Sequence, residues 1–119
     1  MKIAFVGSRN FSCPNFAKEK IYNVLKDISE HIDVTVISGG ARGVDSWAEE
    51  IVDTMKLPKK IFKPDWNRYG KSAGFKRNKL IIDEATNVFA FWDGKSKGTK
   101  HSIDLAIQAG KPVNIYIRK

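Results

Sequence analysis

Residues 34–45, Val34-Thr35-Val36-Ile37-Ser38-Gly39-Gly40-Ala41-Arg42-Gly43-Val44-Asp45, indicate the fold class most clearly. The first four residues are apolar or β-branched, which predicts a short strand. A glycine-rich loop, Ser38–Gly43, follows the strand, and an apolar stripe at helical spacing follows the loop. The stripe is made of Val44, Trp47, Ala48, Ile51, Val52 and Met55. A strand that passes through a glycine loop into an amphipathic helix is the building unit of parallel α/β folds.

The same alternation continues on both sides of this stretch. Short apolar runs bounded by glycine, proline, serine or aspartate predict further strands at Ile3–Val6, Lys60–Phe62, Val88–Phe91 and Val113–Ile117. The runs are nearly continuous, which is typical of strands buried on both faces of a parallel sheet. Right-handed crossovers between such strands give a Rossmann-like α/β fold, an open, doubly wound parallel sheet of about five strands with helices on both faces.

Three further helices fill the intervals between the strands. The first carries an apolar face made of Ala17, Ile21, Val24, Leu25 and Ile28. The second spans Ser72–Ala85, with Leu80 and Ile81 pointing inward. The third spans Thr99–Ala109 and ends at Gly110, and its inward residues are Ile103, Ala106 and Ile107. We therefore expect both faces of the sheet to be covered, and we expect Trp47 of the helical stripe to lie in the core.

Length and composition predict one ordinary globular domain over residues 1–119. Hydrophobic residues make up 42% of the chain and charged residues 29%, and no apolar run approaches the roughly 18 residues of a membrane helix. The single cysteine, Cys13, excludes an intrachain disulfide and a cysteine-based zinc cluster, so no metal site is expected. No signal peptide is evident, and we expect a cytoplasmic protein without a membrane partner.

Basic charge is concentrated in the second half of the chain. Residues 1–55 hold six Lys and Arg against eight Asp and Glu, whereas residues 56–119 hold 15 against five. The formal net charge is +8. Such an excess attracts phosphorylated ligands or polyanions, although a basic surface also keeps a protein soluble. The charge therefore indicates an anionic partner but does not identify which anion it is.

Polar and glycine-rich loops gather at one edge of the predicted sheet. Ligands of doubly wound sheets bind at the carboxyl ends of the strands. The loops predicted at that edge are Gly7–Asn10, Ser38–Gly43, Pro64–Gly70 and Trp92–Thr99, whereas the opposite connections are short. Both Ser38–Gly43 and Asp93–Thr99 follow a strand and open a helix, so each is a candidate phosphate cradle, although a tight turn or a flexible surface loop has the same composition. The first is not a P-loop, because no Gly-Lys-Ser/Thr follows it.

Arginine and tryptophan side chains add to this edge. The arginines that fall on or near it are Arg9, Arg42, Arg68 and Arg77. A guanidinium matches a phosphate through two parallel hydrogen bonds, so these side chains suit a phosphorylated ligand. Trp66 and Trp92 both follow strands, where a tryptophan either stacks on a base or packs against the protein.

Several of these motifs together resemble a known family. They are Gly7-Ser8-Arg9, Ser38–Asp45, Trp66 with Gly70, Ala73-Gly74 with Arg77-Asn78, Phe91–Gly94 with Ser96 and Gly98-Thr99, and Gly110–Val113. The sequence is similar to the YspA-like branch of the SLOG superfamily, which also contains the Smf/DprA DNA-processing proteins and the Lonely Guy phosphoribohydrolases. The resemblance implies a Rossmann-like fold with a nucleotide-type site. The expected ligand-binding residues are Gly7, Ser8, Arg9, Ser38, Gly39, Gly40, Ala41, Arg42, Gly43, Asp45, Trp66, Arg77, Asn78, Trp92, Asp93, Gly94, Ser96, Gly98 and Thr99.

The Lonely Guy pattern bears on catalysis. It places an arginine on the helix before the fourth strand, which Arg77 matches, and a Gly-Thr pair after that strand, which Gly98-Thr99 matches. The glutamates that follow the pair in that pattern are replaced here by Lys100–Ser102. Hydrolysis at a ribose carbon needs a carboxylate. The weak candidates for catalytic residues are therefore Arg77, Asp93 and Asp45.

We expect a small module that binds a nucleotide-derived, phosphorylated ligand at this edge as a sensor or sequestering protein, with no other cofactor required. Two alternatives stay open. A phosphoribohydrolase-like enzyme that cleaves an N-glycosidic bond requires a carboxylate facing the ribose. A single-stranded nucleic-acid binder, as in the DNA-processing branch, requires a basic stripe that extends well beyond the pocket. Compact relatives in the superfamily often form dimers, so a homodimer is also expected.

Overall fold

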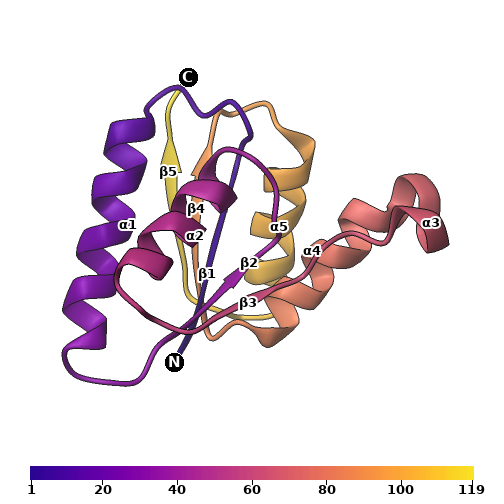
Figure 1. Cartoon of the computed structure of the whole chain (residues 1–119). Helices are drawn as coiled ribbons and strands as arrows, with labels where there is room; N and C mark the ends of the chain where they lie inside the picture. Colours follow the sequence, from indigo (N-terminus) through magenta and orange to yellow (C-terminus); the bar gives the residue numbers. More distant parts are fainter.

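The computed structural model describes residues 1–119, and its centre is one parallel sheet (Figure 1). The strands are β1 (Lys2–Gly7), β2 (Thr35–Ser38), β3 (Lys59–Ile61), β4 (Asn87–Trp92) and β5 (Val113–Ile117). They lie in the order β3-β2-β1-β4-β5, and every neighbouring pair is parallel. The predicted open parallel sheet is confirmed, and each strand begins and ends within one residue of its predicted position.

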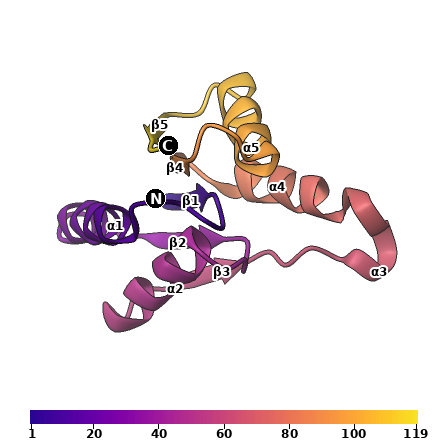
Figure 2. The same cartoon turned by 90° about the horizontal axis from the view of Figure 1, so that it is seen from above.

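Helices cover both faces of the sheet (Figure 2). On one face lie α1 (Pro14–Ser29) and α2 (Val44–Thr54), and on the other lie α4 (Ala73–Glu84) and α5 (Lys97–Gln108). The short helix α3 (Trp66–Tyr69) projects from the body of the molecule ahead of α4 (Figure 1). The doubly wound arrangement is therefore confirmed. None of these helices has the length and apolar character needed to cross a membrane.

Alternate residues of the central strands enter two separate hydrophobic clusters. On β1, Ile3 and Phe5 pack with α1 and α2, while Ala4 and Val6 pack with α4 and α5. The residues of β4 divide between the two clusters in the same way. Both central strands are therefore buried on both faces, as their continuous apolar runs predict.

The prediction of two buried faces is wrong for the edge strands. Ile115 and Ile117 of β5 are exposed, and β3 exposes Lys59 and Lys60. An edge strand has a neighbouring strand on one side only, so the helices that cover the centre of the sheet leave part of it open. A short apolar run does not by itself distinguish a central strand from an edge strand.

Two residues predicted to point inward point outward instead. Leu80 is 53% exposed and Ile107 is 58% exposed. The residues of these helices that do pack against the sheet are Ile81, Ile82, Ile103 and Ala106. In both helices several apolar residues are adjacent or nearly so. The spacing therefore leaves the rotation of the helix open, and packing against the sheet decides it.

Two other segments differ from the sequence prediction. Trp47 is half-buried and packs at the margin of the core, with the Lys18 ammonium 5.6 Å from its ring centre. The segment Pro64–Gly70, predicted as a loop, contains α3. This helix begins where the Asp65 carboxylate accepts a hydrogen bond from the Arg68 N–H at 3.1 Å.

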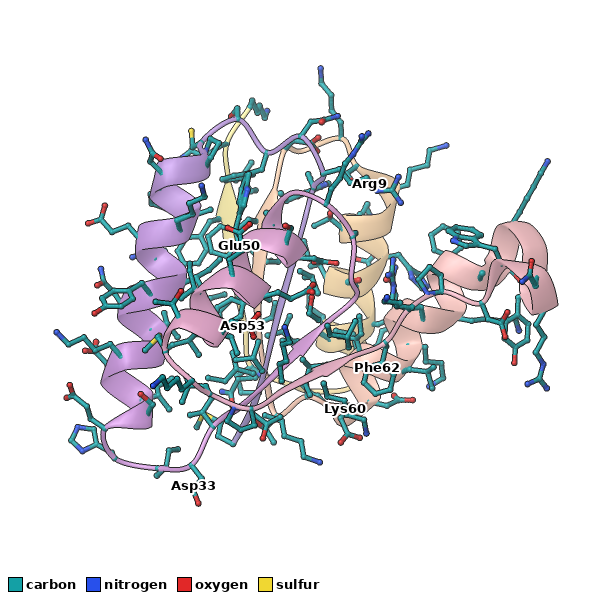
Figure 3. All side chains as sticks on the ribbon, in the orientation of Figure 1. Arg9, Asp33, Glu50, Asp53, Lys60 and Phe62 are labelled. Carbon is teal, nitrogen blue, oxygen red and sulfur yellow. The ribbon has the colours of Figure 1, made fainter.

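The topology brings the loops after β1 and β4 together. These two strands are neighbours, paired from Ile3 with Asn87 to Gly7 with Phe91. The chain leaves β1 toward α1 on one face and leaves β4 toward α5 on the other, and ligand sites form where a doubly wound sheet reverses in this way. Figure 3 shows Arg9 at this carboxyl edge and Asp33 at the opposite edge.

Candidate ligand-binding site

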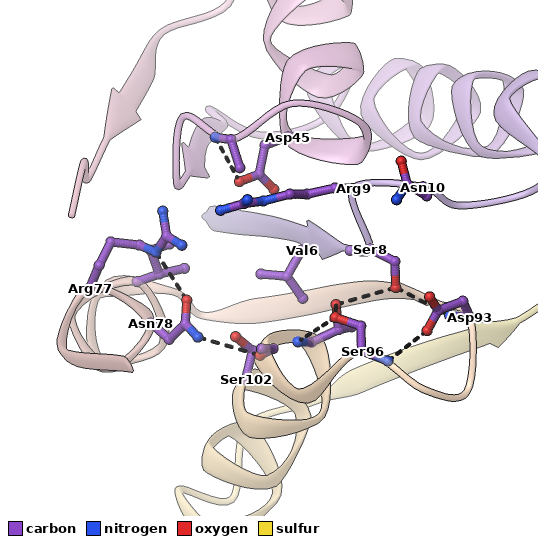
Figure 4. A pocket seen from close by; sticks show the side chains of 15 residues that line it. Val6, Ser8, Arg9, Asn10, Asp45, Arg77, Asn78, Asp93, Ser96 and Ser102 are labelled. Carbon is purple, nitrogen blue, oxygen red and sulfur yellow. Dashed lines mark hydrogen bonds between the residues drawn. The ribbon is translucent and has the colours of Figure 1, made fainter. Parts of the chain in front are cut away.

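A cavity of about 370 Å³ opens at the carboxyl edge of the sheet, and we call it the edge cavity (Figure 4). It is bordered by the end of β1 and its loop, the start of α2, the middle of α4, and the loop and first turns of α5. Its lining residues are Val6, Gly7, Ser8, Arg9, Asn10, Ala41, Asp45, Arg77, Asn78, Ile81, Asp93, Ser96, Gly98, Thr99 and Ser102. None of these side chains is aromatic, so the edge cavity is predominantly polar.

Most of the predicted site residues meet in this lining. Sequence reasoning missed Val6, Asn10, Ile81 and Ser102. Two of these residues could have been predicted from their positions. Asn10 directly follows Arg9, and Ser102 lies one helical turn after Thr99 on the same face of α5. The predicted site residues outside the lining are Ser38, Gly39, Gly40, Arg42, Gly43, Trp66, Trp92 and Gly94.

The glycine loop Ser38–Gly43 supports the edge cavity, and only Ala41 of the loop lines it. A Cβ atom on Gly39 would lie 2.7 Å from the Arg77 Nη1 and 2.9 Å from the Asp45 Oδ2. A side chain at this position would displace one or both groups. The glycine therefore allows a guanidinium and a carboxylate to approach the backbone from two sides.

The other end of this loop joins it to the loop after β1. Gly43 has a φ of +81°, and a Cβ atom there would lie 2.5 Å from the carbonyl oxygen of Arg9. Ser38 is buried, and its hydroxyl donates a hydrogen bond to the Glu49 carboxylate at 2.8 Å. Arg42 is exposed and lies outside the lining. The loop thus holds the walls of the edge cavity in place mainly through its backbone.

Arg77 and Asn78 link three walls of the edge cavity. The Arg77 Nη1 donates to the carbonyl oxygen of Gly39 at 2.6 Å, and its Nε donates to the Asn78 Oδ1 at 3.0 Å. The Asn78 amide in turn donates to the carbonyl oxygen of Gly98 at 3.3 Å. Burial lowers the pKa of the Arg77 guanidinium, Asp45 opposes this effect and Arg9 adds to it. An arginine nevertheless stays charged in proteins.

Asp45 is the buried carboxylate of the edge cavity, with 7% of its surface exposed. Its Oδ2 accepts a hydrogen bond from the Ala41 N–H at 3.2 Å. Its Oδ1 accepts no hydrogen bond within 3.5 Å and is not fully buried, and the Asp45 side chain lines the cavity. Burial raises the pKa of Asp45 to about 6, and the Glu49 charge adds to this rise. The backbone hydrogen bonds from Ala41 and Gly39 and the Arg77 charge oppose it. A carboxyl with such a raised pKa in a cleft is typical of functional sites.

Asp93 has a different environment, although it also lines the edge cavity. Its Oδ1 accepts hydrogen bonds from the N–H groups of Lys95 and Ser96, both at 2.8 Å. These bonds to Ser96 and Lys95 lower the pKa of Asp93. The backbone N–H of Asp93 donates to the Ser8 hydroxyl at 3.2 Å, which ties the loop to β1. Asp93 therefore shapes the loop that leads into α5.

The first turn of α5 presents free backbone donors to the edge cavity. Ser96 precedes the helix, and its hydroxyl accepts a hydrogen bond from the Thr99 N–H at 3.5 Å. Gly98 lies in this turn and has open space where a side chain would be. The positive end of a helix dipole and its unpaired N–H groups favour an anion at this position.

Neither predicted stacking tryptophan lines the edge cavity. The Trp92 Nε1 donates to the carbonyl oxygen of Ser96 at 3.0 Å, and its ring packs against the core between the sheet and α5. Trp66 is 53% exposed on α3, which projects from the body of the molecule (Figure 1), and it is not in the lining. Trp92 therefore packs on the protein, and a base stacked on Trp66 would lie outside the cavity.

Two guanidinium groups face the edge cavity without an acidic partner. Arg9 makes no side-chain hydrogen bond within the protein, and its side chain extends toward Arg77 (Figure 4). All the ion pairs of the structure are made by lysines, so neither arginine is neutralised by a carboxylate within 4.0 Å. Like charges repel, so their convergence favours an anion in the cavity.

Together, the parallel sheet, the helices on both faces and the cavity at the reversal point define a Rossmann-like α/β domain. Within this class, the chain belongs to the YspA, cpYpsA-related SLOG family (YAcAr), whose model matches residues 1–69, from β1 to α3. The Gene 61 protein of Mycobacterium phage D29 is 35% identical over 86 residues, which cover 67% of this chain and 69% of the relative. These matches confirm the resemblance found in the motifs.

Solved structures share the fold at low sequence identity. DNA processing protein A (DprA) from Helicobacter pylori, for which a single-stranded DNA binding mode is described, superposes with a TM-score of 0.78 at 21% identity over 100% of this chain and 66% of that one. DprA from Streptococcus pneumoniae gives 0.76 at 19% identity, over 96% and 49%. The structure of TM1055 gives 0.71 at 21% identity, over 94% and 71%. The chain thus spans about half to two thirds of the DprA proteins.

Proposed function

We propose that this protein binds a nucleotide-derived, phosphorylated ligand in the edge cavity, as a sensor or sequestering module. The observation that carries the proposal is the convergence of Arg9 and Arg77, neither paired with a carboxylate, on a cavity that also receives the first turn of α5. A phosphate there accepts hydrogen bonds from the helix N-terminus and from the Thr99 hydroxyl, while the guanidinium groups balance its charge.

Calorimetric titration with AMP tests the proposal. Arg9→Ala is the most informative variant, because the Arg9 side chain supports no other part of the protein. The loss of a hydrogen bond to a charged group costs roughly 1.5–3 kcal/mol, so AMP should bind about 10- to 100-fold more weakly. Lys79→Ala, which removes the same charge from an exposed position on α4, is the matched control. Equal affinity of Arg9→Ala and the parent would remove the phosphate role of Arg9.

The two predicted arginines outside this pair have smaller expected roles. Arg42 is exposed beyond the lining, and Arg68 lies on α3. Their charges act on a ligand in the edge cavity only through solvent, where salt screens them. We expect Arg42→Ala to weaken AMP binding less than Arg9→Ala does.

A phosphoribohydrolase-like activity is the second candidate, and Asp45 is the observation that favours it. Hydrolysis of an N-glycosidic bond needs a carboxylate that faces the ribose. Asp93 is engaged in the loop before α5, whereas the free oxygen of Asp45 opens into the cavity beside Arg77. Chromatographic detection of free base from AMP, lost in Asp45→Asn, would support this activity. We expect little or no release.

Single-stranded nucleic-acid binding is the third candidate, and the surface formed by α3 and the first turn of α4 favours it. Trp66, Tyr69 and Phe75 are all exposed, and Lys76 and Arg68 approach the Tyr69 ring at 4.8 and 5.0 Å. Exposed aromatic rings among basic side chains are the usual platform for stacked bases. The likeness to DprA in fold makes this candidate worth testing, and the whole-molecule experiment below separates it from the first.

Self-association as a homodimer stays a proposal. Leu80 and Ile107 are large apolar residues exposed on the neighbouring helices α4 and α5, and such residues favour burial against a partner. Light scattering after size-exclusion chromatography reports the mass directly.

A further inference from the structure

The free oxygen of Asp45 imposes a requirement on any ligand of the edge cavity. The carboxylate is nearly buried, its Oδ2 is held by the Ala41 N–H, and no lysine or arginine lies within 4.0 Å of it. An ionised carboxylate only accepts hydrogen bonds. The ligand group that meets Oδ1 must therefore be a donor. A phosphate, which carries negative charge and accepts hydrogen bonds, is repelled from this atom.

The edge cavity consequently has two chemically different walls. The first turn of α5 presents free backbone N–H groups and the Thr99 hydroxyl, which suit a phosphate. Asp93 lies in the loop before this turn, where its carboxylate accepts hydrogen bonds from the Lys95 and Ser96 N–H groups. Asp45 lies on the opposite wall, at the start of α2, with the Arg77 guanidinium nearby (Figure 4). A hydroxyl between Asp45 and Arg77 can donate to the carboxylate and accept from the guanidinium. A ligand that spans both walls has a phosphate at one end and hydroxyls at the other.

The apolar part of the lining is too small to hold a base by stacking. It consists of Val6, Ala41 and Ile81, and neither Trp66 nor Trp92 belongs to it. Bases in proteins are usually held on aromatic or broad apolar surfaces, whereas sugars are held by hydrogen bonds. The polar lining therefore matches the sugar-phosphate part of a nucleotide.

We propose that the edge cavity selects ribonucleotides, with the phosphate on the first turn of α5, a ribose 2′- or 3′-hydroxyl donating to Asp45, and the base outside. This inference rests on the proposed function and adds to it the specificity-determining residue and the sugar that it recognises. Asp45 discriminates because a deoxynucleotide leaves its buried oxygen without a donor. The base, by contrast, contributes little to affinity.

The test compares AMP, 2′-deoxy-AMP and 3′-deoxy-AMP by calorimetry with the parent protein at pH 7.5. AMP should bind at least about 10-fold more tightly than one of the two deoxy analogues, as expected when a buried acceptor is left unsatisfied. CMP, GMP and UMP should bind within about threefold of AMP, the range expected when the base makes no specific contact. In Asp45→Asn, which keeps an oxygen for the Ala41 N–H, the preference for AMP over that analogue should fall below about threefold. Asp83→Asn, an exposed carboxylate on α4, is the control and should keep the preference.

The outcomes separate this inference from the proposed function. Equal binding of AMP and both deoxy analogues by the parent overturns the ribose selectivity and leaves the nucleotide site intact. Preference for the deoxy analogues overturns it as well and favours a DNA strand as ligand. A preference that survives in Asp45→Asn assigns the discrimination to another residue and overturns the role of Asp45. Absence of binding of AMP, ribose 5-phosphate and inorganic phosphate to the parent overturns the proposed function itself.

Discussion

At the scale of single residues, the two carboxylates of the edge cavity show what the sequence hides. Asp93 and Asp45 both follow strands at the same edge, and both were candidates for a chemical role. Backbone N–H groups lower the pKa of Asp93, whereas burial raises the pKa of Asp45 to about 6. The difference depends on which backbone groups point at each side chain, and the pattern of residue types contains no such information.

The raised pKa of Asp45 predicts that Asp45→Asn stabilises the free protein at pH 7.5. The value of about 6 lies above the 3.8 that is usual for an aspartate. The folded state therefore holds this proton more tightly than the unfolded chain, and the parent loses stability as the pH rises from about 4 through 6. We expect the variant to gain about 1–3 kcal/mol at pH 7.5, since one pKa unit corresponds to 1.4 kcal/mol, and to gain almost nothing near pH 4.

Urea unfolding followed by tryptophan fluorescence at pH 4, 5, 6 and 7.5 measures this difference. Asp83→Asn alters an exposed carboxylate and should show no such pH dependence. A gain that is the same at every pH would mean that the introduced amide packs better for reasons unrelated to charge, and the argument from burial would be wrong.

At the scale of elements, the first turn of α5 combines a structural weakness with a free space. Gly98 lies in this turn, and a Cβ atom there would meet nothing within 4 Å. Glycine in a helix costs about 0.5–1 kcal/mol relative to alanine, so Gly98→Ala should stabilise the protein by up to this amount. The same methyl group would occupy the edge cavity at the expected phosphate position. AMP binding, measured by calorimetry, should therefore weaken while the free energy of unfolding rises.

The matched control for this variant is Gly110→Ala, at the opposite edge of the sheet. Gly110 has a φ of +69° and also has open space around it. A side chain in this conformation costs about 1–2 kcal/mol, so stability should fall, whereas AMP affinity should stay unchanged. Unchanged AMP affinity in Gly98→Ala would argue against a ligand over the first turn of α5.

The end of α4 depends on a lysine from a distant part of the chain. The Lys111 ammonium donates to the carbonyl oxygens of Ile82, Asp83 and Ala85 at 2.6, 2.9 and 2.6 Å. The last carbonyl groups of a helix otherwise lack partners. Lys111→Met keeps the aliphatic stem and removes these bonds. The free energy of unfolding, measured in urea, should therefore be about 2–3 kcal/mol lower than that of the parent. Lys79→Met, which loses only a surface ion pair, should change stability by at most about 0.5 kcal/mol.

The sequence predicts elements better than it predicts the contacts between them. Strand positions follow from β-branched runs, and the central strands are buried as their composition indicates. The inward residues of α4 and α5 are set by packing, which is why Leu80 and Ile107 were misplaced. The sequence alone predicts that the loop Ser38–Gly43 lies at the ligand-binding edge of the sheet. That its glycines support Arg77 and Asp45 follows only from three-dimensional distances.

At the scale of the whole molecule, the basic residues that cluster in the second half of the sequence also belong to particular elements of the fold. The second half of the chain, which holds 15 of the basic residues, forms β3, α3, α4, β4, α5 and β5. In Figure 2, α3 extends farthest from the body of the molecule. A long anion could contact several of these basic side chains at once, whereas a mononucleotide needs only the edge cavity. The two ligand classes are therefore separable by experiment.

Salt dependence and the role of Trp66 distinguish an oligonucleotide ligand from a mononucleotide. A 12-nucleotide oligo-dT that contacts several lysines and arginines releases counterions, so its affinity should fall roughly tenfold or more between 50 and 200 mM NaCl, whereas AMP, with one phosphate, should lose only a few-fold. If α3 is a stacking platform, Trp66→Ala should weaken oligonucleotide binding by about 1–3 kcal/mol. The affinity for AMP should not change, because Trp66 lies outside the edge cavity. Fluorescence anisotropy of the labelled strand and calorimetry with AMP, on the same preparations, measure both. Oligo-dT that binds more tightly than AMP at 200 mM NaCl, and that needs Trp66, would place nucleic acid ahead of the mononucleotide as the ligand of this protein.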